Sequence, residues 1–143
     1  TVDYSFIVRE IAEIVSDKNL VSLAFDRWRI DVFKKECERE GISLPLVEFG
    51  QGFKDMSPAI DALEAALLND KIAHAMQPVL TMCAANAVIT KDPAGNRKLD
   101  KHKATGRIDG MAALTMAIGV LNSTVEAPEA LSPWEDSTYS IMG

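Results

Sequence analysis

Two short apolar segments, each followed by a helical segment, constrain the fold of this chain most strongly. Residues 20–25 and 44–49 are predicted to be buried strands, and amphipathic helices are expected over residues 29–40 and 57–68. A strand–helix order with buried strands is typical of a parallel α/β sheet that carries helices on its faces. Because two strands are fewer than a stable sheet normally has, we expect an α/β domain that is N-terminally truncated, with its first strands upstream of Thr1.

The remaining elements follow from capping and turn residues. Asp3 is placed to cap the first helix, and Pro58 is expected at the first position of the 57–68 helix, where proline is favoured. The other expected elements are helices over residues 4–16, 77–85 and 108–121 and a short extended piece at 71–74. Residues 87–90 and 96–99 flank a turn, which indicates either a hairpin or an open excursion of the chain. We therefore expect one domain, residues 1–121, and an acidic, loosely ordered tail, residues 122–143.

Charge is unevenly distributed along the chain. The formal net charge is −6, but residues 91–107 carry six basic and two acidic side chains, so this segment is +4 and the remainder is −10. A basic segment on an acidic body can face a phosphate backbone, whereas a solvated charged hairpin explains the same pattern. Lys101, Lys103 and Arg107 approach Asp109 along the sequence, which makes them the candidates for holding phosphate.

The composition indicates a soluble intracellular domain. Hydrophobic residues make up 48% of the chain and charged residues 25%, as in ordinary globular proteins. Cys37 and Cys83 have no partner at metal-ligand spacing, so we expect buried, reduced thiols. The longest apolar run, residues 111–121, is too short to cross a bilayer, and we expect no membrane association.

Two aspartates are the candidates for chemistry. Asp26 closes the first predicted strand, and Asp109 stands directly before the last apolar helix. A carboxylate at the C-terminal end of a buried strand points into the crevice where open α/β sheets bind ligands. A second carboxylate across that crevice could share a divalent cation, which prefers oxygen ligands. The structural alternatives are that Asp26 caps the following helix and that Asp109 only complements the helix dipole.

Two further side chains near the expected crevice have both a structural and a functional interpretation. Gln51, between two glycines after the second strand, would either reach the crevice or satisfy the loop backbone. Trp28 follows Asp26 closely, and a tryptophan in such a position is more often a packing residue than a platform for base stacking.

An ordered series of stretches resembles the C-terminal nuclease domain of the tailed-phage terminase large subunit. The matching stretches are residues 24–29, 50–53 and 56–59, His74 with Pro78, Asn86, Asp92 with Gly95 and Asn96, and residues 107–110 with 112–113. No single stretch is specific, but their order is, and the series covers residues 3–121.

The resemblance implies an RNase H-like mixed sheet flanked by helices, and a two-metal endonuclease that uses Mg²⁺ or Mn²⁺ to cut concatemeric viral DNA. In that family three acids hold the metals; Asp26 matches the second and Asp109 the third, while the first would lie on the missing opening strand. The implied partners are double-stranded DNA and, for the full-length protein, the portal and the small terminase subunit, in the cytoplasm of a bacterial host. No G-x-x-x-x-G-K-[ST] loop of an ATPase domain is present.

The resemblance also bears on activity and on one histidine. Because one acidic ligand is missing, we expect the chain as given to be weakly active or inactive. His74 lies among apolar neighbours, which favours a structural role, although its match to the family pattern leaves a minor case for contact with DNA. The alternative functions are a non-catalytic docking module of the packaging motor and another RNase H-like nuclease or resolvase.

Overall fold

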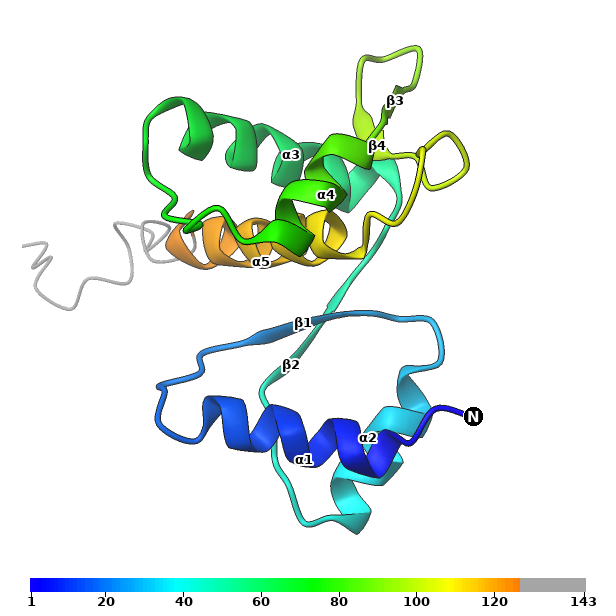
Figure 1. Cartoon of the computed structure of the whole chain (residues 1–143), viewed down its shortest axis with the longest axis vertical. Helices are drawn as coiled ribbons and strands as arrows, with labels where there is room; N and C mark the ends of the chain where they lie inside the picture. Colours follow the sequence, from blue (N-terminus) through cyan, green and yellow to red (C-terminus); the bar gives the residue numbers. More distant parts are fainter. Residues whose placement is uncertain (127–143) are drawn as a thin grey trace, which may run out of the picture.

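The computed structural model describes residues 1–126 as an alternation of helices and short strands (Figure 1). In chain order the elements are α1 (Tyr4–Val15), β1 (Leu23–Asp26), α2 (Ile30–Arg39), β2 (Leu46–Phe49), α3 (Phe53–Leu68), α4 (Pro78–Asn86), β3 (Ile89–Lys91), β4 (Arg97–Leu99) and α5 (Asp109–Glu126). The predicted α/β class is confirmed. The parallel and antiparallel strands occur as two separate two-stranded sheets, β1–β2 and β3–β4.

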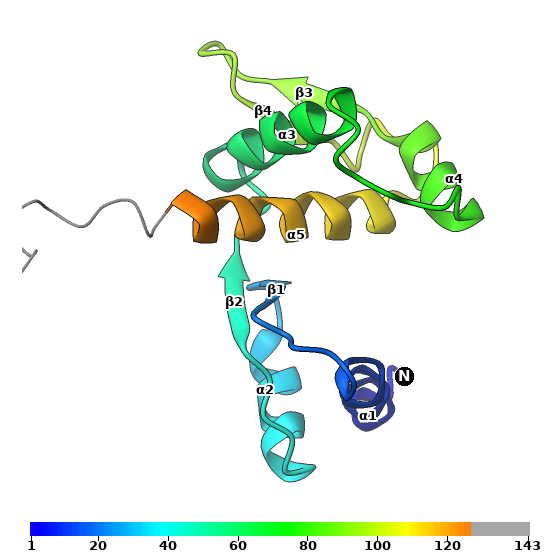
Figure 2. The ribbon, with the colours of Figure 1, turned by 90° about the vertical axis from the view of Figure 1, so that its left-hand side faces the viewer.

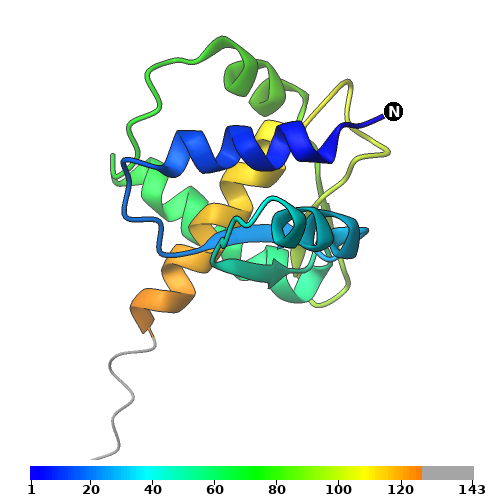
Figure 3. The same ribbon diagram turned by 90° about the horizontal axis from the view of Figure 1, so that it is seen from below.

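The parallel ladder lies between two groups of helices. On one side are α1 and α2; on the other, α5 packs against β1 and β2 and is itself covered by α3 and α4 (Figures 1 and 2). Figure 3 views the same arrangement from the side of α1 and α2. The β3–β4 hairpin packs on α3 through β4. Helix α5 therefore lies between the ladder and the pair α3 and α4.

The register of the parallel ladder positions the candidate site. Leu23 pairs with Leu46 and Asp26 with Phe49, so β1 and β2 end at the same level. The residues that follow each strand consequently emerge side by side at one edge, which is where ligands bind in open α/β sheets.

The hydrophobic core lies where α3, α5 and β2 meet. Its buried members are Phe49, Met56, Ala59, Ile60, Met116 and Val120. Gly119 of α5 faces this cluster so closely that a Cβ there would lie 2.7 Å from the Cβ of Ala59 and 2.8 Å from the ring of Phe49. Real Cβ atoms do not approach this closely, so the crossing of α5 over α3 and β2 depends on glycine.

Two sequence predictions are corrected between β2 and α4. Helix α3 begins at Phe53, so Pro58 lies inside it and not at its first position. The earlier start is supported by Asp55, whose carboxylate accepts the N–H of Gly50 at 3.0 Å. Residues 71–74 form no strand; they belong to a loop in which Ala75 and Met76 have positive φ angles of 48° and 53°, incompatible with an extended chain.

Helix α5 is longer than predicted. It continues past Leu121 to Glu126, so the first residues of the expected tail are helical. The rest of that tail, residues 127–143, lies outside the described residues. Within residues 1–126, none of the helices combines the length and the apolar character that crossing a bilayer requires.

Gly119→Val tests the crossing of α5. The added side chain would overlap Ala59 and Phe49, and we expect the free energy of unfolding to fall by about 1–3 kcal/mol, the usual cost of overpacking. Chemical denaturation measures this loss. Ala117→Val, at an exposed position of the same helix, is the control and should cost less than about 1 kcal/mol. Equal losses in the two variants would contradict a close crossing at Gly119.

Candidate active site

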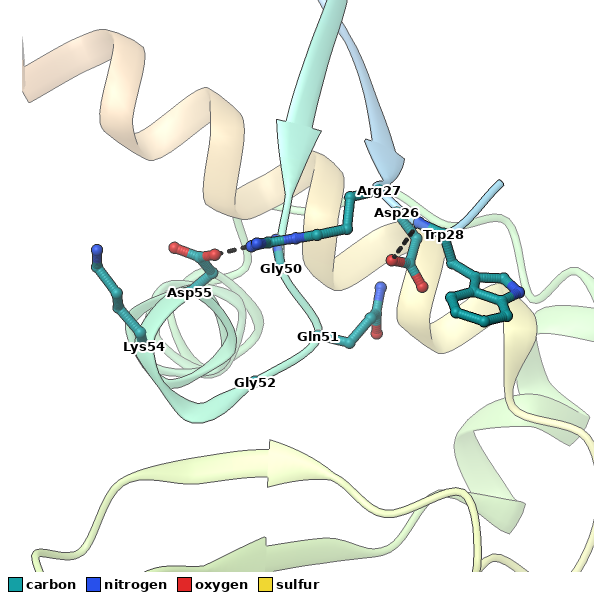
Figure 4. A pocket seen from close by; sticks show the side chains of 8 residues that line it. All are labelled: Asp26, Arg27, Trp28, Gly50, Gln51, Gly52, Lys54 and Asp55. Atoms are coloured by element: carbon teal, nitrogen blue, oxygen red, sulfur yellow. Dashed lines mark hydrogen bonds between the residues drawn. The ribbon is translucent and has the colours of Figure 1, made fainter. Parts of the chain in front are cut away.

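Asp26 is the last residue of β1, and its carboxylate fixes the turn that follows. Its Oδ1 accepts the backbone N–H of Trp28 at 3.2 Å (Figure 4). The N-cap of α2 is Arg29, which has a left-handed φ of 60° and makes no side-chain capping bond. The interpretation of Asp26 as a helix cap is therefore wrong. Within the described part of the chain, its second oxygen has no hydrogen-bond partner and is available to a ligand.

A first hollow, of about 510 Å³, opens on one side of Asp26. Its lining residues are Asp26, Arg27, Trp28, Gly50, Gln51, Gly52, Lys54 and Asp55 (Figure 4). Two of its charged groups already have partners: Arg27 pairs with Glu48 at 3.2 Å, and Asp55 accepts the N–H of Gly50. Lys54 is exposed, which leaves this side chain able to meet an anionic ligand.

A second hollow, of about 460 Å³, lies between Asp26 and the hairpin. Its lining residues are Asp26, Gln51, Phe53, Thr90, Lys98, Leu99, Asp100, Lys101 and His102. Asp26 and Gln51 line both hollows and so stand between them. Gln51 thus reaches the crevice, and its amide donates to the sulfur of Met116 at 3.0 Å, which ties this loop to α5.

Asp100 shapes the part of the second hollow that lies after the hairpin. The carboxylate of Asp100 accepts the backbone N–H groups of His102 at 3.0 Å and Lys103 at 3.1 Å. The bond from Lys103 is the main cause that lowers the pKa of Asp100 below its usual 3.8. The resulting turn presents Lys101 and His102 to the hollow. Sequence reasoning treated Asp100 only as a charge; its position before a short loop was the available signal for a turn.

Asp109 begins α5 and is exposed, but it is not among the residues that line either hollow. The segment before it is held by Asn86, whose Oδ1 accepts from the Thr105 hydroxyl at 3.1 Å and whose Nδ2 donates to the Arg107 carbonyl at 3.2 Å. A Cβ at Gly106 would lie 2.6 Å from that Nδ2. Asn86, which sequence reasoning gave no chemical role, therefore sets the approach of the chain to Asp109.

The structure separates the predicted basic residues by role. Lys101 lines the second hollow, whereas Lys103 and Arg107 are exposed but are not among its lining residues. Arg97 is committed to α3, where its Nη1 meets Glu64 at 2.7 Å and its Nη2 meets Asp61. Lys98 lies 4.8 Å from the ring centroid of Phe53, a cation–π contact.

His74 is not brought to the aspartates. It lines a separate apolar hollow of about 220 Å³ between α3, α4 and α5, together with residues such as Leu67 and Met111. The side chain is exposed, and its Nδ1 accepts the N–H of Met76 at 3.3 Å, which makes a local turn.

The oxygen donors present suit a divalent cation only in part. Carboxylates are the ligands that Mg²⁺ and Mn²⁺ prefer, and Asp26 offers one unpartnered oxygen to a hollow. In residues 1–126, however, no group of three or more His, Cys, Asp or Glu side chains is arranged to hold a metal ion. Asp55, which lines the first hollow, and Asp100, which lines the second, already accept backbone N–H groups.

Comparison with known proteins decides the family. A family model described as the endonuclease domain of the terminase large subunit matches residues 1–124. The chain belongs to this family. It is 66% identical over 125 residues to the terminase large subunit of Enterobacteria phage HK97, a match that covers 87% of this chain and 25% of that protein. A second relative, protein YmfN of Escherichia coli K12, is 38% identical over 72 residues, covering 48% of this chain and 16% of that protein.

Solved structures agree with the family assignment. The HK97 large terminase shares 67% identity and a TM-score of 0.79 with this terminase endonuclease domain, covering 83% of this chain and 25% of that chain. The large terminase nuclease of thermophilic phage G20c, at 18% identity, has a TM-score of 0.62 over 82% of this chain and 62% of that chain, which is a likeness of fold. The fold is thus the RNase H-like fold of terminase nucleases, and the chain spans about a quarter of the HK97 relative.

Asn86→Ala tests how the chain before Asp109 is held. Loss of its two hydrogen bonds should lower the local stability of residues 104–107 by about 1–2 kcal/mol. Faster amide hydrogen exchange in that segment measures the effect. Asn69→Ala is the matched control, because Asn69 bonds only its own helix at Ala65. Unchanged exchange in the Asn86 variant would show that other contacts hold the segment.

Proposed function

We propose that this terminase domain is a metal-dependent DNA endonuclease with Asp26 and Asp109 as metal ligands. The observation that carries the proposal is the exposed Asp26 carboxylate, which has an unpartnered oxygen at the junction of two hollows lined by Lys54, Lys101 and His102. The match of the whole described domain to the terminase endonuclease family supports the reaction type.

The proposed mechanism assigns a task to each part of the site. The chemistry that two Mg²⁺ or Mn²⁺ ions supply in such a site is activation of a water and stabilisation of the leaving 3′ oxygen. Asp26 and Asp109 would supply carboxylate oxygens to those ions. Lys101 and His102, ordered by Asp100, would face the phosphates of the bound strand across the second hollow. Such backbone contacts position DNA without reading its sequence.

The proposed setting follows from the relatives. Phage terminase large subunits are among the relatives. We therefore propose that the parent protein packages and cuts concatemeric viral DNA in the host cytoplasm, with double-stranded DNA, the portal and the small terminase subunit as partners. Gln51, through its bond to Met116, would keep the β2 loop in place, and His74 is assigned no contact with DNA.

One alternative has an observation in its favour. The described residues hold no cluster of three metal ligands, which is what a non-catalytic docking module of the packaging motor would show. Another RNase H-like nuclease or resolvase is disfavoured by the terminase family match.

The metal-ligand assignment is tested by Asp26→Ala and Asp109→Ala in a protein extended upstream to the length of its relatives. Each change removes an anionic ligand and should abolish Mn²⁺-dependent cleavage of plasmid DNA while leaving the circular dichroism spectrum unchanged. Asp17→Ala, an exposed acid paired only with Lys18, is the control and should cleave normally. Cleavage at a near wild-type rate in either test variant would remove that residue from the site, and a docking module would show no cleavage in any variant.

The DNA-binding assignment is tested by neutralising Lys101, Lys103 and Arg107 together. Binding should weaken similarly for all sequences, and the slope of log affinity against log salt should flatten by up to ~0.9 for each lost phosphate contact. Fluorescence anisotropy with labelled duplexes at several salt concentrations measures the slope. The control replaces Arg9, Lys18 and Lys35, which are exposed on α1, on the segment after it and on α2. A slope that changes equally in both variants would assign the three residues to general charge only.

A further inference from the structure

Trp28 is the most exposed large hydrophobic side chain in the described part of the chain. Its relative exposure is 79%, whereas the core residues of this domain are below 9%. The expectation that Trp28 packs into the structure is therefore wrong. Exposing an indole to water is unfavourable, and an exposed indole beside a candidate site is placed to contact a ligand there.

The backbone of Trp28 is held by the residues before and after it. Its backbone N–H is held by the Oδ1 of Asp26 at 3.2 Å. The next residue, Arg29, has a φ of 60°, a left-handed conformation that non-glycine residues seldom adopt and that clusters at functional sites. The indole is consequently presented on the side of Asp26 away from Arg27 and Asp55 (Figure 4). One hydrogen bond thus links the carboxylate of the proposed metal ligand to the backbone of the tryptophan.

The surroundings of the indole in the first hollow suit a nucleic-acid strand. The other lining residues of that hollow are charged, amide or glycine residues, with Lys54 exposed among them. Lys101 lies beyond Asp26 in the second hollow. Proteins bind single-stranded DNA with basic side chains placed along the phosphate backbone and with aromatic side chains on which bases stack. Every base has a face that can stack, so such a site accepts any sequence.

We propose that Trp28 is a stacking platform for an unpaired base next to the phosphate that is bound at Asp26, a role that rests on the proposed nuclease function. Bases in an intact duplex have both faces covered by their neighbours, so this contact requires a base that has left the stack. The site therefore favours DNA with unpaired nucleotides, at a frayed end, a gap or a locally opened cut site, over a continuous duplex.

The test uses the 143-residue chain with Trp134→Phe, which leaves Trp28 as its single tryptophan. Fluorescence is recorded in EDTA, where no metal-dependent cleavage takes place, during titration with oligothymidylate and, separately, with a hairpin duplex. We expect oligothymidylate to quench the emission and to protect the indole from acrylamide, and the duplex to do so only weakly. The variants Trp28→Ala and Trp28→Phe have no tryptophan left to report, so their binding is measured by the anisotropy of a labelled oligothymidylate. Trp28→Ala should weaken oligothymidylate binding about 10-fold, and Trp28→Phe should retain part of the affinity.

The controls separate stacking from general effects. Leu68→Ala changes a side chain that is 78% exposed at the end of α3 and should leave binding unaltered. Thermal unfolding of Trp28→Ala should match that of the parent, because the indole is exposed.

Three results would overturn the proposal. In the first, oligothymidylate leaves the Trp28 emission unchanged. In the second, the Trp28→Ala variant binds oligothymidylate with parental affinity. In the third, the Trp28 emission shifts with protein concentration but does not respond to DNA. The last would instead assign the indole to a protein contact over the neighbouring apolar hollow lined by residues such as Tyr4 and Phe33. Since the readout involves no cleavage, it fails or succeeds separately from the Asp26 and Asp109 tests of the nuclease function.

Discussion

The crossing of α5 over the β1–β2 ladder and α3 is the contact on which the other parts of the described structure depend. At Gly119 the helix backbone comes so close to Ala59 and Phe49 that no side chain fits. Phe49 is also the last residue of β2, so this contact fixes the level at which the ladder ends and the loop containing Gln51 begins. The same helix starts at Asp109, so the core and the approach to the site are set by one rigid element.

Carboxylates at the site act first on the backbone. Asp26, Asp55 and Asp100 each accept main-chain N–H groups and thereby fix the turns around the two hollows. Such bonds to an ionised acceptor are stronger than neutral ones. They also use oxygens that would otherwise be available, so the number of acids near the hollows overstates the number of metal ligands. Asp26 has both properties, because one oxygen orders the turn and the other remains available to a ligand.

Much of the order of elements was predictable from local signals, although the strands expected to be buried are mostly half-buried or exposed, with Phe49 as their one buried residue. The two apolar runs became β1 and β2, Asp3 caps α1, and the turn residues between β3 and β4 gave a hairpin. The failures occurred where a carboxylate that bonds a nearby backbone N–H set the local conformation, which the apolar pattern does not indicate. Pro58 lies inside α3 because Asp55 and Gly50 start the helix earlier. Trp28 is exposed because the turn fixed by Asp26 directs it outward, which no composition or periodicity could reveal.

The candidate site likewise has features that the sequence determined and features that only the tertiary structure decided. The sequence by itself determined which residue types were available and where along the chain they stood: a carboxylate closing a strand, another opening a helix, and a basic segment between them. Only the tertiary structure decided which of them meet. It joined Asp26 with Gln51, Lys101 and His102, committed Arg97 to α3, and placed His74 in another hollow. The physical reason is that strand register and helix crossing act between residues far apart in the chain, and neither is encoded in the spacing of the residues that they bring together.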